Sequence, residues 1–120
     1  MTHQARVVPV HSLDHARTLI KDIGSDPQSI EIMAPKAVFM VIQLDHVSLQ
    51  DAIIVKQDML SIGGEVAIPK HSFDLETDPG SILLMGTLAH YQELIGKLAR
   101  HYPRIQRLAK EIETVIQKTH

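Results

Sequence analysis

The sequence contains no cysteine and no tryptophan, and only two tyrosines and two phenylalanines. Without cysteine, the chain can form no disulfide, thiolate nucleophile or cysteine-based zinc site. With so few aromatic rings, it offers no platform on which nucleic-acid bases could stack. No apolar run exceeds six residues, whereas a membrane-spanning helix needs about 20. These absences argue against thiol chemistry, nucleic-acid binding and a membrane span.

Charge and length set further limits on the class of protein. The net charge is −2 and the isoelectric point is near 6.4, so no field exists to hold phosphates at a distance, and we do not expect nucleic-acid binding, which needs a clustered basic face. The N-terminus, MTHQARVVPV, lacks the apolar region of a secretory signal, and we expect a cytoplasmic protein. At 120 residues the chain predicts one domain, residues 1–120.

Four stretches carry helix signals, namely a capping residue or an initiating proline followed by apolar residues at three- and four-residue spacing. They run from Ser12 to Gly24, Ser48 to Ile62, Thr87 to Leu98 and Pro103 to Ile116. Residues 25–35 are ambiguous. Asp26-Pro27 favours a short helical turn through Met33, whereas the alternation of Ile30 and Ile32 would suit a strand.

Four other stretches are typical of strands: Arg6–Val10, Ala37–Leu44, Glu65–Pro69 and Ser81–Met85. Ala37–Leu44 is almost continuously apolar, which predicts a central strand covered on both faces and ended by a turn at Asp45-His46. The element order β-α-β-α-β-β-α-α predicts a single-domain α/β sandwich with a mixed four-stranded sheet.

A lysine lies on the apolar face of the predicted helix over Leu49–Ile62. Lys56 follows Leu49 by seven residues, which places both on the same side of a helix. A buried ammonium is costly unless it is paired, so Lys56 either extends its charge to water, meets a carboxylate or binds a ligand. Candidate carboxylates are Asp58, Glu65 and Glu93. Candidate ligand-binding residues around it are Gln57 and the turns Gly63-Gly64 and Gly86-Thr87.

Three other constellations point only weakly to chemistry. His11 and His15 have a spacing that suits a metal on a helix, but His11 precedes the cap and no third ligand lies nearby in sequence, so we expect no metal site. Lys70–Asp74 contains Ser, His and Asp without the arrangement of a triad. Gly86-Thr87 joins a strand to a helix N-terminus, which offers N–H groups to an anion.

Several spaced motifs resemble the N-terminal extension of the long dihydropteroate synthases, enzymes of folate biosynthesis. The clearest is Val55–Ala67, VKQDMLSIGGEVA, which is similar to that domain's LKQE-LSLGGDAAV run. Ile30–Lys36, Leu84–Thr87 and the tail Leu94–Ile112 also resemble it, so the likeness covers nearly the whole chain. The family's catalytic barrel takes roughly 200 residues or more. Its pterin loop resembles N-x-T-P-D-S-F, and this sequence contains no asparagine.

The resemblance therefore implies an accessory role without a reaction. We expect a stand-alone, non-catalytic interaction domain that forms a homodimer, through the apolar stripe Ile105–Ile116, or docks on a barrel-type dihydropteroate synthase. The alternative is a small pterin- or phosphate-binding protein or enzyme that uses Lys56. No cofactor is expected in either case.

Overall fold

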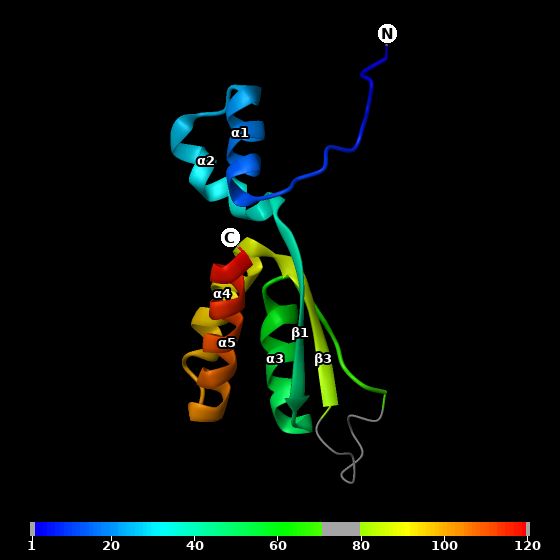
Figure 1. Ribbon diagram of the computed structural model, residues 1–120, viewed down its shortest axis with the longest axis vertical. Coiled ribbons are helices and arrows are strands. Elements are labelled where there is room, and N and C mark those ends of the chain that lie inside the picture. The colour runs from blue at the N-terminus through cyan, green and yellow to red at the C-terminus, as the bar shows by residue number, and fades with distance from the viewer. Residues whose placement is uncertain (1, 71–79, 120) are drawn as a thin grey trace.

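The computed structural model describes residues 2–70 and 80–119 as an elongated, two-layer α/β arrangement (Figure 1). The elements, in chain order, are α1 (Leu13–Ile23), α2 (Pro27–Met33), the 3-10 turn η1 (Ala34–Ala37), β1 (Phe39–Val47), α3 (Leu49–Ser61), β2 (Glu65–Ala67), β3 (Gly80–Thr87), α4 (Leu88–Leu98) and α5 (Pro103–Thr119). Its Cα radius of gyration is 17.0 Å, against about 14 Å for a compact domain of this length.

The sheet of the described residues has three strands in the order β1-β3-β2, and both pairings are antiparallel. The mixed, four-stranded sheet predicted from the sequence is therefore wrong in strand number and in direction. The chain does cross over from β1 through α3 to β2, which makes these two strands parallel in space. They are not neighbours, however, because β3 lies between them and is antiparallel to each, as in a split β-α-β unit.

The predicted first strand, Arg6–Val10, is not a strand in the structure. These residues carry no regular secondary structure and lead away from the body of the molecule (Figure 1). A strand requires hydrogen bonds to a neighbour, and this segment has none within the described chain. Its β-branched composition alone did not reveal that a partner strand was missing.

Strand β1 differs from its prediction in position and in extent. It lies at the edge of the sheet and only one of its faces is covered, so Phe39 remains 64% and Val41 56% exposed. The expected turn at Asp45-His46 is instead a bulge inside a longer strand, since one extra residue separates the pairs Leu44↔Ile82 and Val47↔Gly80. His46 has a φ of 55° there.

Helices α3, α4 and α5 lie together on one side of the sheet (Figure 1). Their inner faces and the inward-facing strand residues form the main core, which includes Ile42, Val66, Leu84, Met59, Leu94 and Ile112. The buried Tyr91 hydroxyl lies 2.9 Å from the Met40 carbonyl and 3.0 Å from that of Leu84, which ties α4 to both long strands. Within the described residues, no helix combines the length and apolarity needed to cross a bilayer.

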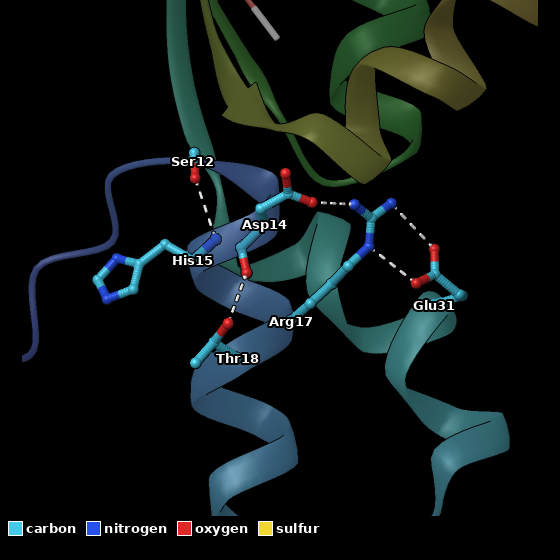
Figure 2. Close-up of polar contacts among 6 residues, drawn as sticks. All are labelled: Ser12, Asp14, His15, Arg17, Thr18 and Glu31. Atoms are coloured by element: carbon cyan, nitrogen blue, oxygen red, sulfur yellow. Dashed lines mark hydrogen bonds and ion pairs between the residues drawn. The ribbon is translucent and has the colours of Figure 1, made fainter.

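The N-terminal helices pack at one end of the sheet around a smaller cluster of Ala16, Ala34, Val38 and Leu88. On their outer surface, the Arg17 guanidinium links α1 to α2 (Figure 2). It donates to Glu31 at 2.8 and 3.1 Å and to Asp14 at 2.6 Å. This exposed network orients the two helices, although ion pairs in water stabilise little.

The helix caps agree closely with the sequence analysis. The side chains of Ser12, Ser48 and Thr87 accept hydrogen bonds from the third residue of the helix that each begins, as expected of N-caps. Gly24 ends α1 in the left-handed conformation, and the ambiguous stretch forms the short helix that Asp26-Pro27 favoured. Local hydrogen-bonding chemistry thus determines where most helices begin.

Candidate functional site

Lys56 is partly buried and paired, as one of the sequence alternatives expected. Its side chain is 33% exposed, and its Nζ donates to the Val66 carbonyl at 2.7 Å and to Glu65 Oε1 at 3.4 Å. Of the three candidate carboxylates, Glu65 is therefore the partner, while Asp58 bonds His101 at 2.9 Å. The lysine fastens the middle of α3 to strand β2.

Two hollows lie beside α3. The larger, of about 520 Å³, is next to the start of the helix at Asp51. The smaller, of about 470 Å³, is next to the later part of the helix, between Ile53 and Leu60. The smaller one is lined by the polar residues Lys56, Gln57 and Lys70 and by the apolar residues Ile53, Leu60, Ile68 and Pro69. The turns Gly63-Gly64 and Gly86-Thr87 do not line it. The structure thus brings Lys56 and Gln57 to one hollow and places the four turn residues elsewhere.

Gly64 and Gly86, one from each turn, lie against the buried side chain of Met59. A Cβ on Gly64 or on Gly86 would lie 2.7 Å from the Met59 Cε, closer than atoms can approach. Gly63, which follows the C-cap residue Ile62 of α3, has a φ of 103°, which favours glycine. The resemblance segment Val55–Ala67 therefore forms the end of α3, a tight turn and β2, with its glycines used for close packing.

Thr87 and His90 form a reciprocal cap at the start of α4. The Thr87 Oγ1 accepts from the His90 N–H at 3.2 Å, and His90 Nδ1 accepts from the Thr87 N–H at 3.0 Å. The Leu88 N–H donates to the Val38 carbonyl at 2.8 Å. Three N–H groups that the sequence offered to an anion are thus used within the protein. His90 was not recognised from the sequence because histidine is an unusual residue for this cap.

A buried carboxylate that the sequence analysis did not single out lies at the start of α3. Asp51 is 3% exposed, and its oxygens accept from Arg104 Nε at 2.7 Å, Arg104 Nη2 at 2.9 Å and the Tyr102 hydroxyl at 2.6 Å. Burial raises the pKa of Asp51, but the hydrogen bonds from Arg104 and Tyr102 outweigh it and the pKa is lowered. Asp51 lies in the first turn of α3, whereas Tyr102 and Arg104 lie at the start of α5, 51 and 53 residues later, and no local sequence pattern indicates this contact.

The larger hollow opens beside this ion pair. It lies between the end of β1, the start of α3 and helix α5, and its charged lining residues are Asp51, Arg104, Arg107, Lys110 and Glu111, with His46 at the rim. Because the lining mixes both signs of charge, and Asp51 already engages Arg104, it presents no concentrated field for one class of ion.

His11 and His15 lie together but gather no third metal ligand among the described residues. The His11 and His15 rings stack with centroids 5.0 Å apart, and His15 Nδ1 accepts from the His11 N–H. Among the residues that the structure describes, no three His, Cys, Asp or Glu side chains gather as metal ligands. Of the Lys70–Asp74 motif, residues 71–74 lie outside the described residues.

The outer face of the sheet carries an exposed apolar patch. Phe39 and Val41 of β1 lie there beside Met85 and Leu83 of β3 and Ala67 of β2, since Val41 is opposite Met85 and Leu83 is opposite both Gln43 and Ala67. Polar groups border this patch at one end, where Gln43 and Ser81 donate to Asp45. No described helix covers this face (Figure 1).

Comparison with known proteins adds no assignment. No family model, no curated protein and no solved structure matches the chain.

Proposed function

We propose that this chain is a non-catalytic accessory domain that binds another protein through the outer face of its sheet. The observation that carries the proposal is strand β1. Its sequence is apolar on both faces, yet Phe39 and Val41 remain more than half exposed on the outer one. A sheet face normally packs against a second layer, and exposed apolar patches mark interaction sites.

The resemblance to the dihydropteroate synthase extension supports a particular partner. We propose that the face docks on the helical outer layer of a barrel of that family, since helices are the usual second layer over such a sheet. The contacts of Lys56 agree with a structural role for the motif Val55–Ala67, because its ammonium donates hydrogen bonds to the Val66 carbonyl and to Glu65 within that motif. No pterin chemistry is required of this chain.

The docking proposal is tested by placing a charge on the outer face. In Val41→Asp, a carboxylate would be buried in the interface, and we expect binding to a purified barrel-type dihydropteroate synthase to weaken at least about tenfold, equal to 1.4 kcal/mol. Isothermal titration calorimetry measures this change. The folded state should be retained, since Val41 is 56% exposed in the free chain.

The matched control is Ile32→Asp on α2. Ile32 is 64% exposed and lies on a helix remote from the sheet face, so this variant should bind like the parent protein. Absence of binding by the parent, or equal weakening by both variants, would refute docking through the sheet.

The hollow beside Lys56 supports a second candidate function, the binding of a pterin or a phosphate. Its apolar walls and two lysines could hold a flat ring bearing an anionic group. In this case Lys56 would exchange its bond to Glu65, which is long at 3.4 Å, for the ligand.

Replacing Lys56 with methionine separates these uses of the lysine. The ion pair with Glu65 is long and adds little, but the substitution also removes the 2.7 Å hydrogen bond to the Val66 carbonyl, so we expect the free energy of unfolding to fall by about 1–2 kcal/mol with the fold retained. Thermal-shift titration with pterin and with inorganic pyrophosphate then gives the binding readout. Loss of a ligand response in Lys56→Met, but not in the exposed-lysine control Lys21→Met, would establish the second function. No response in the parent protein would exclude it.

A further inference from the structure

Within the described part of the chain, strand β1 is paired with β3 on one side only, so one row of its backbone groups has no partner strand. The Leu88 N–H donates to the Val38 carbonyl directly opposite it, and the register pairs Phe39 with Thr87 and Met40 with Gly86. In an antiparallel ladder, hydrogen bonding alternates along the strand. The backbone groups of Phe39, Val41 and Gln43 therefore point away from β3, towards the free edge. Such an edge is a template for another strand.

The segment Arg6–Val10 has the composition of a strand but pairs with no strand among residues 2–70 and 80–119. Val7 is 94% and Val8 48% exposed, although valine is among the residues that strands favour most. Figure 1 shows the segment leaving the body near the start of α1 and running away from β1. Only its last residue, Val10, contacts the small N-terminal cluster.

We propose that the Arg6–Val10 segment of one copy pairs antiparallel with the free edge of β1 in a second copy, and that the exchange is reciprocal. Each sheet then gains the fourth strand that the sequence predicts, supplied by the other molecule. The proposal does not depend on what docks on the sheet face. The added strand would widen that face and remove its most exposed edge.

The position of Pro9 determines which side of the segment can pair. Proline has no N–H, so within a strand it must face away from the neighbouring ladder. Because N–H groups alternate in direction, Pro9 and Val7 face outward, and Arg6, Val8 and Val10 face β1. This alternation leaves an N–H on each of the three residues that would bond the edge.

Side chains in this pairing are complementary in polarity and charge. With Val8 opposite Val41, Val10 falls opposite Phe39 and Arg6 opposite Gln43. These side chains share the outer face, since hydrogen-bonded pairs project to the same side. Arg6 then lies diagonally near Asp45. Hydrogen bonds from Gln43 and Ser81 lower the pKa of Asp45 and keep it ionised as a partner for the arginine.

The position of Val10, the end of the segment that joins the body of the molecule, makes a closed dimer possible. Val10 and Val38 belong to the same cluster, so the segment starts beside the N-terminal end of its own β1. A two-fold axis between the N-terminal ends of two β1 strands would let each segment run antiparallel along the other strand. Five residues span about 17 Å, and reciprocal contacts of this kind close into a symmetric dimer.

Two proline substitutions test the pairing, because N–H groups of successive residues in the segment point alternately towards β1 and away from it. Val8→Pro removes an N–H that bonds the edge, whereas Val7→Pro removes one that faces outward. Sedimentation equilibrium should show a dimer for the parent protein and for Val7→Pro, with a dissociation constant raised at least about tenfold in Val8→Pro. Both residues are exposed in the single chain, so neither change should unfold it. Equal effects of the two variants would overturn the proposal.

The cysteine-free background allows a second, covalent test. In Val8→Cys combined with Val41→Cys, opposite residues of a hydrogen-bonded pair have Cα atoms about 5.5 Å apart, which a disulfide can span. Oxidation should give a covalent dimer on a denaturing gel. An oxidised species that remains a monomer would show that the segment pairs with its own β1, and absence of oxidation would show no pairing. Either result contradicts the exchange.

Discussion

Replacing Arg104 with methionine should destabilise the protein more than replacing its partner Asp51 with asparagine. The Asp51 side chain is 5% exposed, whereas that of Arg104 is 51% exposed. Loss of the arginine strands a buried carboxylate, whose cost is roughly 3 kcal/mol, the lower end of the usual range because Tyr102 still donates to it. Loss of the carboxylate leaves an arginine that water can solvate, and asparagine keeps one acceptor. Urea unfolding of both variants measures the difference.

Acid should remove the contribution of Asp51 in the parent protein. Its pKa in the folded state is lowered, so the unfolded chain takes up the proton first. The stabilisation is complete above the ordinary aspartate pKa near 3.9 and is lost as pH falls through the lower, folded value. The Asp51→Asn variant should show a smaller loss of unfolding free energy between pH 5 and pH 2. Equal stability of Arg104→Met and Asp51→Asn at pH 7 would contradict the asymmetry.

Adding a methyl group at Gly86 or Gly64 should be the second large effect, because Met59 fills the space between these glycines. Met59 is completely buried, and each new Cβ would lie 2.7 Å from its Cε. We expect Gly64→Ala to cost about 1–3 kcal/mol through overpacking, since the three atoms nearest its Cβ, at 2.7–2.8 Å, all belong to Met59. Met59→Ala should cost roughly 2–5 kcal/mol through the cavity that it leaves.

The combined variant tests whether these residues interlock. In Gly64→Ala with Met59→Ala, the added Cβ occupies part of the space that the methionine vacates, so the double variant should lose less stability than the sum of the two. A double-mutant cycle from thermal or urea unfolding gives this coupling. Gly96→Ala is the matched control, since nothing lies within 4 Å of a Cβ there. Simple additivity would show that Met59 adapts to each change independently.

The sequence was most informative where the decisive interaction is local. The caps at Ser12, Ser48 and Thr87, and the helix that begins at Pro27, depend on side chains bonding backbone groups at most three residues away. A pattern within a short window contains that information. The pairing of Lys56 with Glu65 was also among the alternatives, because nine residues and one turn separate them.

Interactions between distant segments could not be read in the same way. Nothing local indicates that β3 lies between β1 and β2, so an α/β alternation that usually gives parallel neighbours produced an antiparallel sheet. The same holds for the Asp51–Arg104 pair, which joins the starts of two helices. Strand Ala37–Leu44 was correctly identified as apolar, but its sequence could not say that one face would be left bare in a single chain.

The hydrophobic core is divided into two clusters, so the parts of the molecule around them should differ in local stability. Met40 and Ile116 are the described residues that contact both the main core and the small cluster around Ala16. Local unfolding follows such boundaries, and regions with fewer buried contacts open at lower free energy. Helices α1 and α2 should therefore detach as one cooperative unit while the sheet and α3–α5 remain folded. Because Val10 belongs to that unit, each such opening would also change the reach and direction of the N-terminal segment.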